Sequence, residues 1–536
     1  MMNDFFYRTE DILATEVLDY FVETREDREV VDQLKGRNPT VIVGSRGVGK
    51  SFLMRVAEQE LKQDFAESKI LPVYITFVSS SLVRTDDPDQ FRNWMLARIC
   101  SAVLRAVQKF GLMTNRTGSA NILAGLPSNH LDTSKLEGII SSYEKSWETP
   151  GVSVDVSALP SIEEIKFSLE DLAEEIGVRR FSLFMDEAAH IFLPSQQRQF
   201  FTLFRDLRCP TVTCNAAVYP GVTSFGDTFQ PNHDATIVSL NRDIGAKSYT
   251  DSMLQIVEKQ ADAKLLTAIS KNMQNFNILA FASTGNPRVL LKTVSEATKM
   301  NSTEVNTVVR EYYRSGIWSE HSILSEKYIG HKGIIDWGRD FLEDVVLPEL
   351  KKKNDAYISQ EKNTTSFIWI HRDAPQMVKE ALRILCYTGV LTEHSSGIRA
   401  TRNEIGKRYI VNLGCLFALE TSATGSAFEI ASSLTPKRMS EFGSNHSAFK
   451  SLLDLKIDLD ELEEGFDLNS QLAKSNSELD VTIWQRSKLN ELGLNTIGDV
   501  FAATETQLKR AYMIGDVRAR RMKNAAIYSV LEYLSG

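Results

Sequence analysis

Residues 44–51 constrain this chain more than any other stretch, because they fit the pattern G-x-x-x-x-G-K-[ST] at every fixed position. The apolar run at 40–43 is typical of a buried strand, and the apolar spacing in 51–63 is typical of a helix. Glycines let backbone amides approach a phosphate closely, and a helix start adds the positive end of its dipole. The stretch therefore predicts a triphosphate-binding loop in an α/β fold. We expect this loop to consist of Gly44, Ser45, Arg46, Gly47, Val48, Gly49, Lys50 and Ser51.

Two residues of the loop carry the chemistry that a nucleoside triphosphate needs. Lys50 should reach the β- and γ-phosphates of ATP, and the hydroxyl of Ser51 should ligate Mg²⁺. The partner of such a loop is a carboxylate at the end of a neighbouring buried strand, and the apolar run 181–185 ends in Asp186 and Glu187. Asp186 is predicted to hold Mg²⁺, and Glu187 is predicted to polarise the attacking water as the general base. The alternative interpretation is an acidic pair that only caps the next helix.

Helices and strands continue to alternate after this acidic pair. The segment 195–208 has one apolar face and predicts a helix, whereas 210–219 and 235–240 are rich in β-branched residues and predict strands. Such alternation indicates a parallel sheet with helices on both faces. A polar residue in 210–219 could sense the γ-phosphate and the attacking water, and Asn215 is our candidate for this catalytic role. The alternative is an asparagine that serves the turn at the strand end.

These motifs resemble those of the AAA+ ATPases, and most closely the branch that contains the origin-recognition and Cdc-type replication initiators. The phosphate loop, the acidic strand end, the polar strand and TGNPRVLL at 284–291 carry the resemblance. It implies that Arg288, as the second sensor in a helical lid, contacts the γ-phosphate; the alternative is a surface arginine at a helix start. The segment 226–235 should carry the arginine finger but contains no arginine, and Arg242 beyond it is a poor substitute in position.

The chain changes character after the predicted lid. In 375–394 an amphipathic helix is followed by a short strand, and a glycine-containing turn and a second strand come next. This order resembles the winged helix that follows the ATPase in replication initiators, in which the helix enters the major groove. Lys379 and Arg383 lie four positions apart and so share one helix face. They predict phosphate contacts or, alternatively, a solvated face on a protein-docking module.

The last segment of the chain is locally basic. Its short helices and glycine turns resemble helix-hairpin-helix domains and the C-terminal domain of the bacterial RNA polymerase α subunit. The resemblance implies a hairpin at Ile514-Gly515-Asp516 whose backbone amides meet a DNA phosphate, although Met513 stands where such hairpins usually have a second glycine. The alternative is a protein-docking module of the same fold. The predicted DNA-binding residues are Gly515, Lys509, Arg510, Arg518, Arg520, Arg521 and Lys523.

Together these patterns predict an α/β chain: a P-loop AAA+ parallel sheet with a helical lid, a winged helix and a small all-α helix-hairpin-helix-like domain. The insertion between Lys50 and Asp186 predicts surface structure with one helical piece. The expected ranges are 1–246 for the nucleotide-binding core with an insertion at about 112–161, 247–330 for the lid, 331–450 for the winged-helix region, 451–480 for an acidic linker and 481–536 for the last domain.

Charge and composition limit the partners of the chain. Its net charge is −9, so any contact with nucleic acid must be a local patch. The five cysteines form no CxxC pair, which argues against a disulfide framework and against a zinc site. The first residues lack a signal-peptide pattern, and no apolar run approaches the ~20 residues of a membrane helix. We therefore expect a cytoplasmic protein without a membrane partner.

Three functions fit these patterns. The first is an ATPase, with ATP and Mg²⁺ as cofactors, that acts as a nucleotide-controlled switch on duplex DNA in replication, repair or defence. The second is a signalling NTPase of the STAND type whose C-terminal modules dock protein, and the missing finger arginine favours it. The third is a scaffold that binds nucleotide without hydrolysis, against which Glu187 argues. A homo-oligomer or a protein partner is compatible with the first two.

Overall fold

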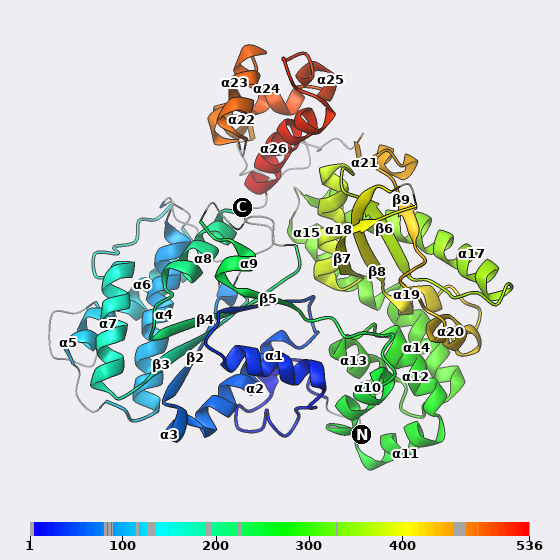
Figure 1. The fold of residues 1–536 in the computed structure, drawn as a ribbon, viewed down its shortest axis with the longest axis horizontal. Helices are drawn as coiled ribbons and strands as arrows, with labels where there is room; N and C mark the ends of the chain where they lie inside the picture. Colours follow the sequence, from blue (N-terminus) through cyan, green and yellow to red (C-terminus); the bar gives the residue numbers. More distant parts are fainter. Residues whose placement is uncertain are drawn as a thin grey trace. The chain divides into compact units, whose positions relative to one another are not determined.

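The computed structural model in Figure 1 describes the chain except for residues 1–4, 80–82, 84–86, 88, 114–116, 126–133, 150, 189–193, 222–224, 226–227, 329–330, 402, 454–467, 480 and 535–536. The chain forms two compact units. The first comprises residues 1–267 and 285–295, and the second comprises 268–284 and 296–536. The range predicted as a lid, 247–330, therefore contributes to both units.

The first unit is built on a five-stranded sheet (Figure 1). Its strands are β1 (Thr40–Val43), β2 (Ile70–Thr76), β3 (Arg180–Asp186), β4 (Val212–Val218) and β5 (Thr236–Ser239). Their order is β2-β3-β4-β1-β5, and every neighbouring pair is parallel. The strands β3 and β4 are buried along their whole length, which explains their largely apolar sequence. The predicted α/β class with a parallel sheet is confirmed.

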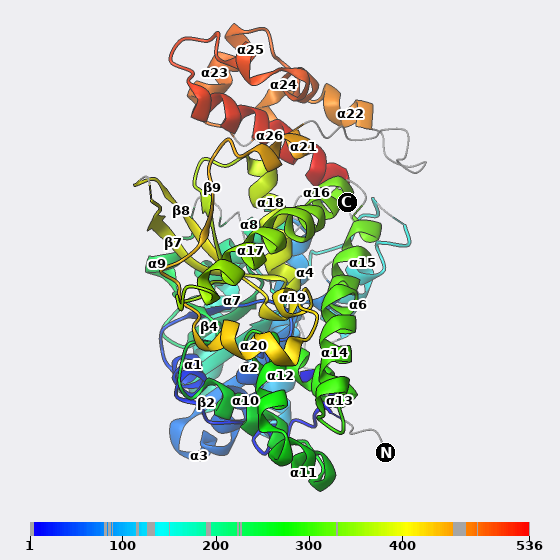
Figure 2. The same ribbon diagram turned by 90° about the vertical axis from the view of Figure 1, so that its right-hand side faces the viewer.

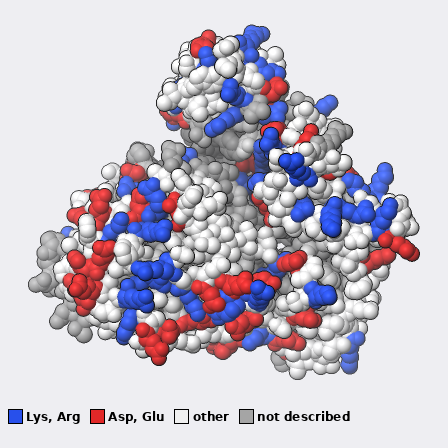
Figure 3. Space-filling view, viewed as in Figure 1, with Lys and Arg blue, Asp and Glu red and all other residues white. Residues whose placement is uncertain are grey.

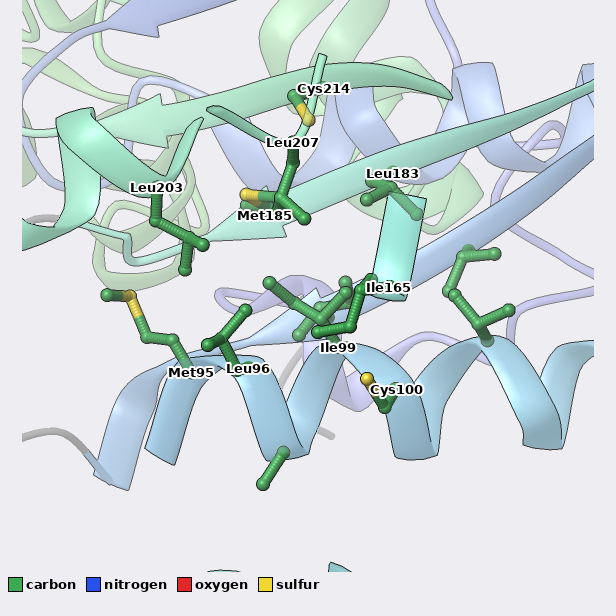
Figure 4. Close-up of a cluster of buried hydrophobic side chains, with 14 of the residues drawn as sticks. Met95, Leu96, Ile99, Cys100, Ile165, Leu183, Met185, Leu203, Leu207 and Cys214 are labelled. Atoms are coloured by element: carbon green, nitrogen blue, oxygen red, sulfur yellow. The ribbon is translucent and has the colours of Figure 1, made fainter. Parts of the chain in front are cut away.

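Helices cover both faces of this sheet. On one face, Ile42 and Phe184 pack with α1 (Arg25–Lys35) and α2 (Lys50–Gln63). On the other face, Leu183 and Met185 pack with α4 (Gln90–Lys109), α7 (Ile162–Glu175) and α8 (Pro194–Asp206). In Figure 4, Met95, Leu96 and Ile99 of α4 point toward the face of the sheet that carries Leu183 and Met185. Successive residues of β3 thus alternate between two cores, as the two-residue period of a strand requires.

The predicted insertion contains two described helices, α5 (Gly118–Leu123) and α6 (Ser134–Glu144). Helix α6 lies along α4, where Arg98 donates a hydrogen bond of 2.7 Å to a carboxylate oxygen of Glu144. Leu136 and Tyr143 of α6 are fully buried in the same core as α4. The insertion is therefore not only surface structure, because α6 completes the core on this face of the sheet.

Acidic and basic side chains interleave on the surface over α1 and α2 (Figure 3). Arg28 and Lys35 of α1 each donate a hydrogen bond of 2.6 Å to the carboxylate of Glu60 on α2. This network joins α1 to α2, the helix that follows the predicted phosphate loop. The other helices of this part of the chain are η1 (Thr9–Asp11), α3 (Phe65–Ser68), α9 (Pro231–Asp234), α10 (Tyr249–Glu258), α13 (Pro287–Glu296) and α11 (Ala263–Lys271), which crosses the boundary between the units.

The second unit combines helices with a four-stranded sheet in the order β7-β8-β6-β9. Its strands are β6 (Phe367–His371), β7 (Leu391–Arg399), β8 (Ile405–Val411) and β9 (Ser440–Phe442). The helix α18 (Gln376–Thr388) is followed by the antiparallel pair β7 and β8, which is the element order predicted for a winged helix. The remaining α-helices of this region are α12 (Met273–Ala282), α14 (Ser302–Arg314), α15 (Ser319–Lys327), α16 (Lys332–Asp340), α17 (Leu347–Ile358), α19 (Leu413–Phe417), α20 (Ala423–Ser432) and α21 (Lys450–Leu453). Its other helical elements are η3 (Gly316–Trp318), η5 (Phe341–Val346) and η6 (Ser447–Phe449).

The basic face predicted on α18 is only partly present. Arg383 is buried and donates a hydrogen bond to the carboxylate of Glu380 on the same helix. The helix packs against α15 and α16, so this side of it faces the interior of the unit. The expectation that Lys379 and Arg383 share an exposed face was wrong for Arg383, because the four-residue spacing does not show which face of a helix its neighbours cover.

The chain ends in a small all-α domain (Figure 2). Its helices are α22 (Leu468–Ala473), α23 (Ile483–Glu491), α24 (Ile497–Ala502), α25 (Glu505–Leu508) and α26 (Asp516–Leu534). Thr482, Thr496 and Thr504 each begin a helix with a reciprocal capping box, which accounts for the repeated short helices. Half of the predicted acidic linker, residues 454–467 and 480, lies outside the described residues, and α22 falls within its described part. Over the part of the chain that the structure describes, no helix has both the length and the apolar composition needed to cross a membrane.

Candidate nucleotide-binding site

The predicted phosphate loop joins the end of β1 to the start of α2. Gly47 has a φ of 82° and Gly49 a φ of 106°, which are left-handed conformations that favour glycine. A Cβ atom on Gly47 would lie 2.7 Å from the Cβ of Arg288 and 2.7 Å from the Oδ1 of Asn286. Gly47 is therefore required for the turn and for the close approach of the segment that begins α13.

Lys50 lies at the first position of α2 and is buried. Its Nζ atom donates hydrogen bonds to the carbonyl oxygens of Gly44, at 2.6 Å, and Ser45, at 3.0 Å. Burial lowers the pKa of Lys50 to about 7, although the carboxylates of Asp186 and Glu187 act in the opposite direction. The structure thus brings the loop lysine and the two predicted acids into one electrostatic environment.

Asp186 is the last residue of β3 and is 4% exposed. The hydroxyl of Tyr74, on the neighbouring strand β2, donates a hydrogen bond of 2.5 Å to its Oδ2 atom. Its Oδ1 atom accepts a hydrogen bond of 3.0 Å from the backbone N–H of Glu187. Arg55 of α2 stacks on Tyr74, with its Cζ atom 3.3 Å from the ring centre. These contacts fix the direction of the carboxylate that was predicted to hold Mg²⁺.

Glu187 follows β3 with a φ of 52°, an uncommon conformation for a residue other than glycine. Such strained positions cluster at functional sites. Burial and the charge of Asp186 raise the pKa of Glu187, whereas the hydrogen bond from Tyr219 opposes this shift. A raised pKa suits a general base that must take a proton from water near neutral pH.

Tyr219 is a site residue that the sequence did not single out. Its hydroxyl donates a hydrogen bond of 3.1 Å to Oε1 of Glu187, and Lys50 Nζ lies 4.2 Å from its ring centre. It directly follows β4, whose end meets the ends of β1 and β3 at one edge of the sheet. The signal that could have found it is this position, because ligand-binding residues in parallel sheets follow the strands.

Asn215 was predicted to sense the γ-phosphate, and the structure corrects this prediction. It pairs with Thr40 at the start of β1, whereas the phosphate loop follows the end of that strand. Its side chain is fully buried, accepts a hydrogen bond from the backbone N–H of Thr40 and donates to the carbonyl of Leu34 and the hydroxyl of Ser182. Asn215 therefore ties β1, β3 and α1 together within the sheet and does not reach the loop.

Arg288 lies at the start of α13, beside the phosphate loop. Its backbone N–H donates to the carbonyl of Gly47 at 3.4 Å, and its Nε donates to the carbonyl of Tyr7 at 2.8 Å. Asn286 supports this approach by donating a hydrogen bond of 2.8 Å to the carbonyl of Arg46. The arginine that the resemblance assigned to the γ-phosphate is thus adjacent to the loop, and its guanidinium is oriented by the N-terminal segment.

Arg242 also lies at the phosphate loop. It donates hydrogen bonds to the carbonyls of Val48, at 3.0 Å, and Gly285, at 3.2 Å. It also donates to both carboxylate oxygens of Asp27 on α1, at 3.0 and 3.2 Å. All of these contacts lie within the first unit, where the Arg242 side chain joins α1, the phosphate loop and the segment that leads into α13.

For the ATP hydrolysis that the sequence predicts at this site, replacing Tyr219 by phenylalanine is expected to lower the turnover rate constant about tenfold with little change in ATP affinity. The change removes one hydrogen bond to a charged group, which is worth about 1.5–3 kcal/mol, and leaves the ring beside Lys50 in place. Single-turnover phosphate release and an equilibrium ATP titration measure the two quantities separately. An unchanged or faster turnover would show that the hydroxyl does not position Glu187 for the reaction.

The comparisons with known proteins agree with the predicted resemblance. The model of the ORC-CDC6-like family matches residues 5–78, a range that contains β1, the phosphate loop and α2. This match confirms the predicted likeness to the origin-recognition and Cdc-type branch. No curated protein matches the chain.

Three solved structures are similar to the chain at low identity. The Walker-type ATPase paby2304 of Pyrococcus abyssi is 14% identical, with 80% of this chain and 99% of that chain covered and a TM-score of 0.38. The ORC1 protein of Aeropyrum pernix in complex with DNA is 12% identical, with 76% and 93% covered and a TM-score of 0.32. The ORC2 protein of Aeropyrum pernix, as ADPNP–ADP complexes, is 11% identical, with 78% and 97% covered and a TM-score of 0.36.

Proposed function

We propose that this chain, whose residues 5–78 match the ORC-CDC6-like family model, is an ATPase that uses its nucleotide state to control binding to duplex DNA. The observation that carries the proposal is the convergence of Lys50, Asp186, Glu187 and Arg288 on one glycine-rich loop. Each of these residues has the chemistry that its part of ATP hydrolysis requires.

The donor set at the loop fits ATP together with a divalent cation. Backbone amides of the loop and Lys50 would hold the phosphates, and Arg288 would meet the γ-phosphate. Ser51 and Asp186 offer the hard oxygen ligands that Mg²⁺ prefers, and Tyr74 already orients Asp186. Bound Mg²⁺ would neutralise negative charge on the β- and γ-phosphate oxygens.

Glu187 is the proposed general base of the reaction. It accepts a proton from water as the water oxygen attacks the γ-phosphorus, and the bond from that phosphorus to the bridging oxygen breaks to give ADP and phosphate. Tyr219 orients the carboxylate through the hydrogen bond to its Oε1 atom. The base and its orienting residue come from two neighbouring parallel strands, so the sheet sets their separation.

The connectivity of the chain favours a switch. Helix α13 carries Arg288 and belongs to the first unit, yet the residues on both sides of 285–295 belong to the second unit. Any displacement of α13 that accompanies loss of the γ-phosphate is therefore passed covalently to the second unit at two points. Movement of a helix that touches the phosphates is a common route from nucleotide state to global conformation.

The C-terminal domain is the proposed DNA-binding module. Of its predicted basic residues, Lys509 pairs with Asp516 at 2.8 Å and Arg520 with Glu505 at 3.3 Å. Lys523 is half-buried and donates to the carbonyl of Phe501. Gly515 precedes the first residue of the 19-residue helix α26, whose amide end can bind a phosphate. The exposed cations that remain for phosphate contact are Arg510, Arg518 and Arg521.

Replacing Arg510 and Arg521 together by alanine is expected to weaken duplex binding about tenfold or more at moderate salt and to flatten its salt dependence, because two phosphate contacts are lost. ATP affinity should not change. Lys474→Ala, which removes an exposed cation of the same domain from its pair with Glu478, is the matched control. Fluorescence anisotropy with a labelled duplex at several salt concentrations measures the effect, and an unchanged affinity would refute the assignment.

A signalling NTPase that docks protein is the second candidate. The observation that favours it is the segment 226–235, which has no arginine to act on a neighbouring subunit. Arg242 does not take that role, since its guanidinium bonds to Asp27 within the same chain. ATPase rates measured with and without duplex DNA separate the candidates: a rate that DNA does not change, together with no salt-sensitive DNA binding, would favour the protein-docking function.

A further inference from the structure

The C-terminal domain exposes large apolar side chains that its core does not use. Ile483 is 85% exposed, Trp484 39%, Tyr512 76% and Met513 62%. The core of the domain is formed instead by their neighbours, such as Leu489, Leu508 and Ile514. Exposed apolar side chains that occur singly need no explanation, but a contiguous group marks a binding surface.

A single arginine connects the two segments that carry these side chains. Arg518 of α26 donates a hydrogen bond of 2.7 Å to the carbonyl of Met513, and its Cζ atom lies 5.0 Å from the ring centre of Trp484. Ile483 and Tyr512 are the chain neighbours of Trp484 and Met513. We call Ile483, Trp484, Tyr512, Met513 and Arg518 the aromatic–arginine cluster.

The backbone of the cluster is strained where its apolar side chains are presented. Met513 has a φ of 62°, in the left-handed region that is costly for a residue with a side chain. A glycine at this position would adopt the same turn without that cost. Strain of this kind persists at positions that serve a function, and here it accompanies a mostly exposed methionine rather than a packed one.

Basic residues occur close to the cluster in the sequence. The Nζ atom of Lys488 lies 5.8 Å from the ring centre of Trp484 and pairs with Glu491 at 2.7 Å. Arg510, two residues before Tyr512, and Arg521, three residues after Arg518, are exposed. The nearby acid Asp516 is already paired with Lys509. Aromatic faces interleaved with arginine and lysine suit the bases and phosphates of a nucleic-acid strand, whereas an apolar protein partner would not require this charge.

We propose that the aromatic–arginine cluster stacks on unpaired bases of a DNA strand, so that the C-terminal domain prefers DNA with a single-stranded segment over an intact duplex. This inference rests on the proposed DNA binding of the domain and specifies the form of DNA that it recognises. Trp484 and Tyr512 supply the stacking faces, and Arg510, Arg518 and Arg521 contact the phosphates on either side. Stacking requires that bases be accessible, which a fully paired duplex prevents.

The test uses the full chain with ATP and Mg²⁺ and three labelled DNAs: a single strand, its duplex, and that duplex with a single-stranded overhang. The parent should bind the single strand and the overhang more tightly than the duplex. Replacing Trp484 and Tyr512 together by alanine should weaken binding to the single strand and the overhang about tenfold or more, with duplex affinity little changed. The pair Trp484→Phe and Tyr512→Phe should retain most of the affinity, because aromatic faces remain.

Trp147→Ala is the matched control, since Trp147 is 51% exposed in the first unit and should affect no DNA form. Circular dichroism of each variant reports whether the domain remains folded. Duplex binding by the parent without any preference for unpaired bases would overturn this inference alone. The same would follow if replacing Trp484 and Tyr512 together by alanine lowered the affinity for all three DNAs equally. Failure of the parent to bind any of the three DNAs would overturn the proposed function as well and point to a protein partner.

Discussion

Replacing Glu187 by glutamine should lower ATP turnover by a factor of about 10²–10⁴, because a positioned general base contributes an acceleration of this order. The amide has nearly the shape of the carboxylate, and its oxygen can still accept the hydrogen bond that the Tyr219 hydroxyl donates. It cannot take a proton from water. ATP affinity should therefore be retained while the chemical step fails, which a binding titration and single-turnover phosphate release measure independently.

The control for this substitution removes the charge of another carboxylate, one that lies close enough to Glu187 to affect its pKa. Glu10 is exposed, and its charge contributes to the raised pKa of Glu187. Glu10→Gln removes the same unit of charge without removing the general base, so turnover should stay near the parent rate. Normal turnover in Glu187→Gln would mean that another residue handles the water, and loss of ATP binding would mean that Glu187 has a structural role in the loop.

The site residues that could be predicted from the sequence are those at the start or end of a helix or strand whose bounds the local sequence pattern shows. The loop that ends in Lys50 follows a short apolar strand, and its spacing alone places the lysine at a helix start. Asp186 and Glu187 could be placed because the apolar run before them ends at the acidic pair, and β3 ends at Asp186. In each case the residue lies at the end of an element whose end is visible in the sequence.

The residues that were missed depend on where a strand stops and on which elements meet. Asn215 looked suitable because it is polar within an apolar strand, but β4 continues to Val218, so the position at the sheet edge falls to Tyr219. Helix α18, which carries Arg383, packs against α15 and α16, and helix α6 packs against α4. No local sequence pattern identifies these packing partners. A sequence periodicity of three or four residues shows that a helix has an apolar face, but it does not show which residues tertiary packing buries.

The contacts of Arg242 are the clearest example of tertiary packing that the sequence does not predict. Their loss is also expected to have the largest effect on stability. The side chain of Arg242 is 13% exposed and that of Asp27 is 5% exposed, and the two meet through two hydrogen bonds. The same guanidinium bonds the carbonyls of Val48 and Gly285. The two charged residues are 215 positions apart in the chain, so nothing in the sequence links them.

Replacing Arg242 by alanine should destabilise the first unit by about 3–5 kcal/mol, because it leaves the buried carboxylate of Asp27 without its partner. Nucleotide affinity should fall as well, since the loop carbonyl of Val48 and the segment before α13 lose the donor that they share. Urea unfolding followed by a probe in the first unit measures the first effect, and ATP titration well below the unfolding transition measures the second.

Two further variants separate the charge effect from the loss of loop contacts. Arg25→Ala breaks the exposed pair Arg25–Glu29 on the same helix, where both side chains are mostly in solvent, and should change the unfolding midpoint little. In the double variant Asp27→Asn, Arg242→Ala, the uncompensated charge is gone, so much of the stability should return while nucleotide affinity stays low. Recovery of stability and affinity together would show that Arg242 only neutralises Asp27. Recovery of stability alone would show that its hydrogen bonds to Val48 and Gly285 hold the phosphate loop against the segment that positions Arg288.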